Sequence, residues 1–262
     1  MSFKRIPLEQ QIKDIARIKE KINTVQNGKV IYVTISGSDL YGFPSKDSDI
    51  DYRGCYLTGT HSLMGLHRPK DVIEMLPDIV MFELSKELGL AISGNCNVLE
   101  HIFAPSIYST VEFLKMKPMI MNAMGKDGIY HSYKGLATFN YKKFIMAGKK
   151  SYKKYLYILR GLMACIYTMQ TGKIQPDINE LNKYFKIKEV KKLVEMKKNG
   201  VENDELEVEE LRNSGTIDTL IVDLFARTDE AYTKSKMPNK VSPDDISNLN
   251  SFLIDLRREH MK

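Results

Sequence analysis

The sequence has few of the patterns that mark disulfide-bonded, zinc-binding or membrane-spanning proteins. Its 262 residues include three cysteines, Cys55, Cys96 and Cys165, which are widely spaced. An odd number of cysteines without a C-x-x-C pair offers neither a disulfide framework nor a zinc or redox motif. There is no run of 18 apolar residues, and the polar N-terminus lacks the apolar core of a signal peptide. We therefore expect buried thiols, no membrane partner and a cytoplasmic protein.

The histidines and the charge distribution restrict the possible classes of function further. The five histidines form no pair at metal-ligand spacing, and none lies in a motif that contains a catalytic nucleophile. The sequence therefore does not support a nucleophilic catalytic triad. A hydrophobic fraction of 43% and a charged fraction of 27% are typical of globular proteins. The net charge of +6 is uneven, because residues 141–200 hold 15 Lys or Arg against 4 Asp or Glu. A basic segment of this kind suits a phosphate-rich substrate, although solvated Lys-rich helices would explain part of it.

The most informative stretch is residues 29–57. A β-rich apolar run over 29–35 ends at Ser36-Gly37-Ser38, and a second run begins at Asp49-Ile-Asp51 and continues to Leu57. These patterns predict two strands joined by a polar connection. Small residues at 36–38 let the backbone approach a phosphate closely, and a helix that starts soon after would point N–H groups at that anion.

Asp49 and Asp51 are two residues apart, so on a strand both side chains leave the same face. Two carboxylates in that position repel each other unless a cation neutralises them. Hard oxygen ligands at a strand end favour Mg²⁺, which binds one or two carboxylates and fills its shell with water and substrate phosphates. The alternative is a surface turn with two solvated carboxylates.

The Gly37-Ser38 turn, followed after ten residues by the Asp49-Ile-Asp51 pair, resembles the polymerase-beta-type nucleotidyltransferase superfamily. The longer motif, which also includes Tyr41-Gly42 and Ser48 to Gly54, is similar to that of the predicted nucleotidyltransferases associated with RNA repair, the RlaP-type family. The resemblance implies metal-assisted nucleotidyl transfer with two Mg²⁺ ions, or Mn²⁺ in their place. It also implies a third carboxylate on a neighbouring strand, and Asp78 before an apolar run is the best match. Glu74 is the alternative.

A second stretch, Lys153 to Arg160, resembles the family's Lys-Lys-Tyr-x-Tyr-x-x-Arg helix. At 100° per residue its Leu and Met side chains share one face, while the opposite, cationic face carries Lys150, Lys153, Tyr157 and Arg160. We expect this cationic face to look outward and to meet the triphosphate of a bound nucleotide. A Lys-rich helix that is simply solvated is the alternative. The resemblance assigns nucleotide contacts to Gly37, Ser38, Ser48, Arg53, Lys153, Lys154, Tyr157 and Arg160.

Local signals predict further elements. Helices are expected over 7–26, with Ile12, Ile15, Ile18 and Ile22 facing a sheet, over 82–92, and over 243–260. Asn97 and Glu100 have the spacing of a capping box. Pro105 and Pro118 are expected to bracket a short helix. The chain reads mostly helical from about residue 130, so we place domain boundaries at 1–128 and 129–262.

The sequence therefore predicts an α/β (α+β) fold, a polymerase-beta-like core with a small mixed sheet, followed by an all-helical C-terminal domain. The expected activity is Mg²⁺-dependent transfer of a nucleoside monophosphate from an NTP, with ATP among the candidates, to a hydroxyl of RNA or tRNA. Asp49, Asp51 and Asp78 would hold the metal. Two alternatives remain: toxin-like AMP transfer to protein or tRNA, and a polynucleotide-binding protein without catalysis. Oligomeric state is not readable from these patterns.

Overall fold

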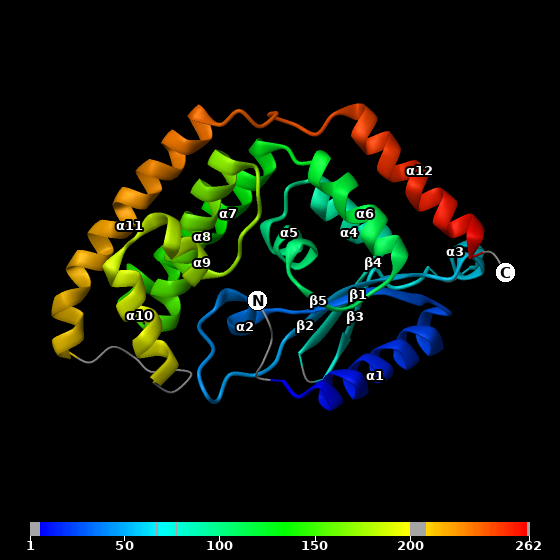
Figure 1. Ribbon diagram of the computed structural model, residues 1–262, viewed down its shortest axis with the longest axis horizontal. Helices are drawn as coiled ribbons and strands as arrows, with labels where there is room; N and C mark the ends of the chain where they lie inside the picture. The colour runs from blue at the N-terminus through cyan, green and yellow to red at the C-terminus, as the bar shows by residue number, and fades with distance from the viewer. Residues whose placement is uncertain (1–5, 67, 77, 200–207, 261–262) are drawn as a thin grey trace. The chain divides into compact units, whose positions relative to one another are not determined.

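The computed structural model describes residues 6–66, 68–76, 78–199 and 208–260 (Figure 1). It confirms the mixed α/β fold class with a helical C-terminal region. The chain forms two compact units. The sheet unit comprises residues 1–36, 50–124 and 241–262, and the helical unit comprises 37–49 and 125–240. Relative to the expected division at residue 128, the helical unit includes the segment after the first strand, and the sheet unit includes the last helix.

A five-stranded mixed sheet forms the centre of the sheet unit, in the order β3-β4-β2-β1-β5. β1 runs antiparallel to both β2 and β5, β2 runs parallel to β4, and β3 runs antiparallel to β4. The predicted strand over 29–35 is present. The second strand is present up to Leu57 but begins at Tyr52, so Asp49 and Asp51 precede it instead of lying on it as expected. The bounds are β1 Lys29–Ile35, β2 Tyr52–Leu57, β3 Val72–Met75, β4 Ile79–Glu83 and β5 Ser106–Ser109.

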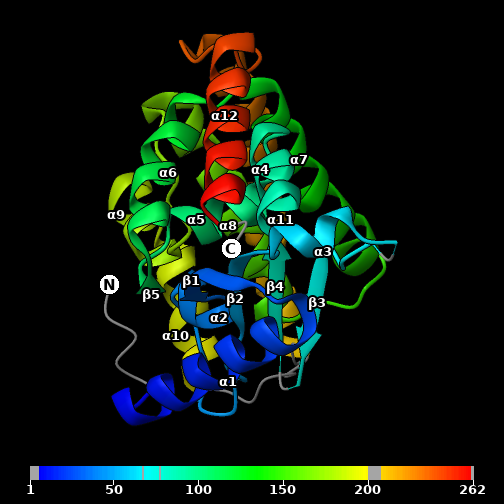
Figure 2. The same cartoon turned by 90° about the vertical axis from the view of Figure 1, so that its right-hand side faces the viewer.

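Helices cover both faces of this sheet (Figure 1). α1 packs on one face, where Ile18 and Ile22 are fully buried against Val33 and Ile35, whereas Ile12 is exposed. On the other face α4 contacts β2 and β4, α6 contacts β1, and α12 packs on α4 and α6 (Figure 2). The helices of this unit are α1 Leu8–Gln26, α3 Thr60–Met64, α4 Leu84–Ile92, α5 Cys96–Phe103, α6 Val111–Asn122 and α12 Pro243–Glu259.

Several helix ends follow from local chemistry. α1 ends at Asn27, whose left-handed φ of 45° suits asparagine, and α12 begins with Ser242 as N-cap and Pro243 in its first turn. The predicted cap of α5 is wrong, because the side chain of Asn95, rather than that of Asn97, accepts from the backbone N–H of Val98 at 3.1 Å. Glu100 is fully buried rather than placed at the helix start.

The expected helix between Pro105 and Pro118 is present as α6, but its bounds differ from the expectation. Residues 106–109 form the edge strand β5, and α6 then continues through Pro118 to Asn122. Pairing with β1 is a long-range interaction, which helical spacing within the segment does not reveal.

The helical unit is built around α8, which contacts α7, α9, α10 and α11. Almost all of α8 from Tyr155 to Met169 is buried, and the three cysteines of the chain, including Cys165 here, are buried thiols as expected. None of the described helices combines the length and apolar character that crossing a bilayer requires. The helices are α2 Gly37–Tyr41, α7 Lys126–Asn140, the π-helix η1 Tyr141–Ile145, α8 Tyr152–Thr171, α9 Ile178–Phe185, α10 Lys188–Asn199 and α11 Val208–Lys234.

Candidate active site

Three chain segments meet at one edge of the sheet. The backbone N–H of Ser36, just after β1, donates to the carbonyl of Asp51 at 2.8 Å, and the N–H of Tyr52 donates to the carbonyl of Asp78 at 2.9 Å. Because β2 and β4 are parallel and pair Tyr52 with Ile79, Asp51 and Asp78 precede neighbouring strands at the same edge. The sheet therefore brings these two predicted carboxylates to adjacent positions.

Arg53 joins the two strand starts. Its guanidinium lies 3.3 Å from a carboxylate oxygen of Asp51 and donates to the carbonyls of Tyr52 at 2.8 Å and Asp78 at 2.9 Å. Both side chains are half-buried, which reduces the screening of their charges by water. Arg53 was predicted to contact the nucleotide. In this arrangement it orients Asp51 and fixes the turn that carries Asp78.

The sheet order bears on whether Asp78 or Glu74 is the third carboxylate that the sequence predicts. Asp78 is exposed and adopts a left-handed φ of 38°, which aspartate tolerates better than most residues. Glu74 lies on β3 opposite Val80 of β4, so a whole strand separates it from β2. The position of Asp78 next to the start of β2 favours it as a partner of Asp51.

His101 is a residue of this edge that the sequence analysis missed. It is buried on α5, and its Nε2 lies 2.9 Å from Oγ of Ser36, the residue before Gly37. This bond supports the end of β1, where the chain leaves the sheet. A lone histidine within an apolar helix gives no signal of such a role, because the contact joins residues 65 positions apart.

In the helical unit, the segment 37–49 packs on α8, α9 and α10. Gly37 and Gly42 have positive φ angles of 61° and 85°, which favour glycine. A Cβ on Gly42 would come within 2.4 Å of side-chain atoms of Asp177 and Asn179, so the close approach to α9 also requires glycine. The amide of Asn179 donates to the carbonyl of Gly42 at 2.8 Å.

Aromatic and cationic contacts hold the same segment on α8. The guanidinium carbon of Arg160 lies 3.8 Å from the ring centroid of Tyr41, and Tyr157 makes edge contacts at 5.5 Å with both Tyr41 and Phe43. The structure thus brings the chain that follows Gly37-Ser38 together with two predicted residues of the Lys/Arg helix. The expectation that this cationic face looks outward is wrong for Arg160, which is 1% exposed and packs against the ring of Tyr41.

α10 contributes a buried lysine that the sequence analysis treated only as part of a basic helix. Lys197 is 2% exposed, its ammonium donates to Oγ of Ser45 at 3.1 Å, and that hydroxyl lies 2.9 Å from Oγ of Ser48. Ser48 precedes Asp49, which is exposed. The spacing of Val190, Leu193, Val194 and Lys197 places the lysine on the apolar face of α10, and this signal could have revealed its burial.

The predicted metal ligands have the right donor chemistry. Asp51 and Asp78 supply carboxylate oxygens, which Mg²⁺ prefers, while Asp49 belongs by its contacts to the helical unit. Among the described residues, no three His, Cys, Asp or Glu side chains are grouped so as to hold a metal ion. The three-carboxylate ligand set of Asp49, Asp51 and Asp78 therefore stays a prediction.

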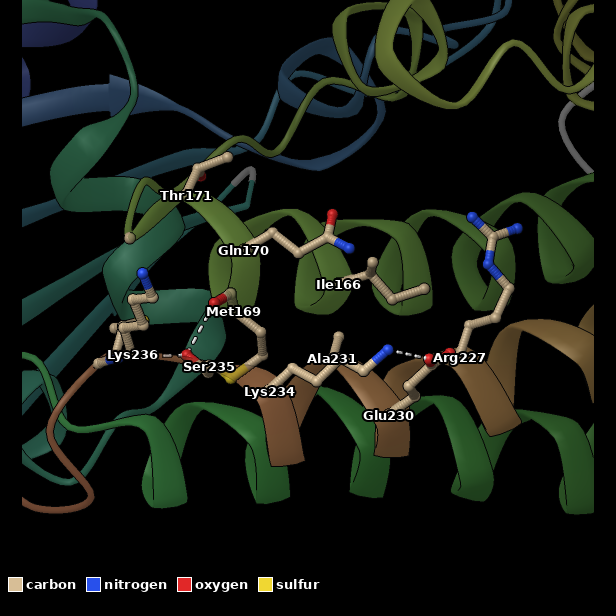
Figure 3. Close-up of a pocket in the computed structure, with 12 residues that line it drawn as sticks. Ile166, Met169, Gln170, Thr171, Arg227, Glu230, Ala231, Lys234, Ser235 and Lys236 are labelled. Carbon is tan, nitrogen blue, oxygen red and sulfur yellow. Dashed lines mark hydrogen bonds and ion pairs between the residues drawn. The ribbon is translucent and has the colours of Figure 1, made fainter.

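A cavity of about 610 Å³ lies elsewhere in the helical unit (Figure 3). It is lined by residues of α8 between Ile166 and Thr171, by Gly172, and by residues in and after α11 between Arg227 and Met237. Of its charged side chains, Lys234 pairs with Glu230 across one turn and Arg227 pairs with Asp223. None of the predicted site residues lines this cavity, so it does not coincide with the candidate site.

Comparison with known proteins gives consistent matches. Residues 9–255 match the RlaP family, described as the RNA repair pathway DNA polymerase beta family. The chain is 29% identical over 265 residues to the uncharacterized protein YcgL of Bacillus subtilis, covering 96% of each chain. It is also 33% identical over 160 residues to an uncharacterized protein of Methanocaldococcus jannaschii, covering 57% of this chain and 64% of that one.

Proposed function

Because the chain belongs to the RNA repair pathway DNA polymerase beta family, which supports a nucleotidyltransferase-type role, we propose a specific reaction for it. The protein transfers a nucleoside monophosphate from an NTP to a hydroxyl of RNA or tRNA. The acceptor oxygen forms a bond to the α-phosphorus, and the bond from that phosphorus to the oxygen bridging to the β-phosphate breaks. Pyrophosphate leaves, and the hydroxyl proton passes to solvent.

The placement of Asp51 and Asp78 before neighbouring parallel strands carries this proposal. Two carboxylates at one sheet edge fit a cation that takes its remaining ligands from water and phosphate oxygens. Asp49, Asp51 and Asp78 would hold two Mg²⁺ ions, or Mn²⁺ as a substitute. Bound there, the metal would stabilise charge on the phosphates and lower the pKa of the acceptor hydroxyl. Arg53 keeps the Asp51 carboxylate in place.

The packing of segment 37–49 supports a role in triphosphate binding. Asn179, Arg160, Tyr157 and Lys197 fix the backbone on both sides of the Gly42 turn, so the segment is organised before substrate arrives. In the proposal, Gly37, Ser38 and Ser48 donate to phosphate oxygens. Lys153 and Lys154, with Arg160, supply positive charge to the triphosphate.

The decisive experiment supplies each NTP, labelled at the α-phosphate, with Mg²⁺ and either total RNA, tRNA, protein or DNA. We expect label in the RNA or tRNA fraction, and none when EDTA removes the metal. Label in protein would instead favour AMP transfer to a polypeptide, and no label in any fraction would favour a binding protein without catalysis.

Asp51→Asn and Asp49→Asn test the metal ligands. Each removes a carboxylate charge from a position outside the core, so we expect an intact fold and a loss of transfer of at least about 100-fold. Asp47→Asn is a matched control, because Asp47 is an exposed carboxylate in the same connection. Activity within about tenfold of the unchanged protein in both site variants would reject the assignment.

A further inference from the structure

A basic surface lies on the helical unit where α7 ends and α8 begins. Residues 139–154 form the end of α7, the π-helix η1 and the first turn of α8, and we call them the Lys-Phe surface. Lysines recur along these residues, which include neither Asp nor Glu. A stretch with only positive charge and interleaved aromatic rings is typical of nucleic-acid binding.

Cations and rings alternate on this surface. The ammonium of Lys143 lies 5.1 Å from the ring centroid of Phe139 and 5.4 Å from that of Phe144. The ammonium of Lys154 lies 3.9 Å from the Phe144 centroid. Phe139 is 56% exposed and Met146 is 69% exposed, so apolar groups face water beside the charges. An exposed ring of this kind offers a flat face on which a ligand can stack.

The lysines of this surface differ in their ion pairing. Lys150 pairs with Asp218 at 2.7 Å. In the part of the chain that the structure describes, no carboxylate lies within ion-pair distance of Lys142, Lys143 or Lys149, which are all exposed. Burial, together with the neighbouring charges of Lys153 and Lys143, lowers the pKa of Lys154. An anion bound to this surface would relieve that repulsion.

The backbone conformation is also unusual at this place. The N–H of Met146 bonds to the carbonyl of Tyr141 at 3.0 Å, and the N–H of Lys149 bonds to that of Phe144 at 2.8 Å, both with the five-residue spacing of a π-helix. π-helical turns are rare and often occur at functional sites. Here the turn presents Lys142 and Lys143 consecutively, between Phe139 and Phe144 in the chain.

We propose that the Lys-Phe surface binds single-stranded RNA, with phosphates on Lys142, Lys143 and Lys149 and a base stacked on Phe139. An exposed ring next to cations fits an unstacked base beside a phosphate. An acidic polypeptide offers charge without such a flat face, and a duplex keeps its bases inside. The assignment of this RNA as the acceptor strand rests on the proposed function, whereas the binding itself does not.

Binding is measured with the full chain in EDTA and without NTP, so that no transfer occurs. The probe is a fluorescent oligouridine of about 16 nucleotides, titrated at salt concentrations from about 50 to about 200 mM. For Lys142→Ala with Lys143→Ala we expect about tenfold weaker binding. The slope of log affinity against log salt should fall by about 0.7 for each phosphate that the variant no longer neutralises.

Phe139→Ala separates stacking from charge. It should weaken oligouridine binding about tenfold and leave the salt slope unchanged, because base stacking carries no counterion release. Lys191→Ala with Lys192→Ala is the matched control, since both are exposed lysines on α10 of the same unit. The control variant should bind as the unchanged protein does.

Three results would overturn the proposal. One is unchanged oligouridine affinity and salt slope in the Lys142, Lys143 variant, or an equal loss in the control. Another is polyglutamate that displaces the oligouridine as well as unlabelled RNA does, which would assign the surface to an acidic protein. The third is an affinity for duplex RNA that equals the affinity for the single strand and is unchanged by Phe139→Ala.

The two proposals fail separately. Transfer of label to RNA without any loss of RNA binding in the surface variants would reject this inference and leave the nucleotidyltransferase intact. Loss of RNA binding in those variants, with no transfer from any NTP by the unchanged protein, would support the surface and reject the reaction.

Discussion

Glu87 of α4 is a carboxyl group buried under the sheet, and its replacement by Gln should change how stability depends on pH. It is 1% exposed, accepts a hydrogen bond from the phenol of Tyr32 and lies beside the thiol of Cys55. Within the described residues its Oε2 has no hydrogen-bond partner. Burial raises its pKa from 4.5 to about 7, although the bonds from Cys55 and Tyr32 favour the charged form.

The sign of the effect follows from the two pKa values. The folded protein binds the Glu87 proton more tightly than the unfolded chain does, so this contribution to stability is fully present below pH 4.5 and is lost as the pH rises through about 7. A tenfold difference in proton affinity corresponds to about 1.4 kcal/mol, so the full effect is about 3 kcal/mol. Gln stays neutral and removes this pH dependence.

Urea unfolding of the unchanged protein and of Glu87→Gln, from about pH 4.5 to about pH 8, measures the difference. The unchanged protein should lose about 3 kcal/mol relative to the variant over that range. Fitting an amide in place of the carboxyl group changes the free energy of unfolding by an amount that does not depend on pH. This amount cancels when the change of unfolding free energy with pH is compared between the two proteins. Glu20→Gln, which removes an exposed carboxylate from α1, should stay within about 0.5 kcal/mol of the unchanged protein. Parallel curves for Glu87→Gln would refute the reasoning.

Three further predictions concern individual residues. Asp78→Asn should reduce transfer as severely as Asp51→Asn while Glu74→Gln stays active; steady-state rates with the opposite ranking would move the third ligand to Glu74. Arg160→Lys keeps the charge but removes the planar group from Tyr41, so we expect the apparent KM for NTP to rise about tenfold, and an unchanged NTP titration would contradict this. Asn95→Ala should cost about 1 kcal/mol in urea unfolding because α5 is no longer capped, with the exposed Asn97→Ala as a near-neutral control.

Local signals in the sequence were sufficient for the elements that depend on neighbouring residues. The β-rich run over 29–35, the spacing of Ile18 and Ile22, and the Ser242-Pro243 start all correspond to elements of the structure. Hydrophobic periodicity and capping act within a few residues, so one chain segment carries the whole signal. The motif pattern likewise selected the family and the residues Asp49 and Asp51, whose roles stay predictions.

Only the tertiary structure decided which segments meet. Asp78 lies next to the start of β2 because β2 and β4 are parallel neighbours, and residues 106–109 are a strand because β1 offers them a free edge. Arg160, predicted to face outward, is buried, and the ring that packs on it belongs to Tyr41, more than 100 positions away in the chain. A helical wheel identifies the face on which a cation lies. Whether water or another segment covers that face depends on long-range packing, in which the burial of Arg160 is compensated by the ring of Tyr41.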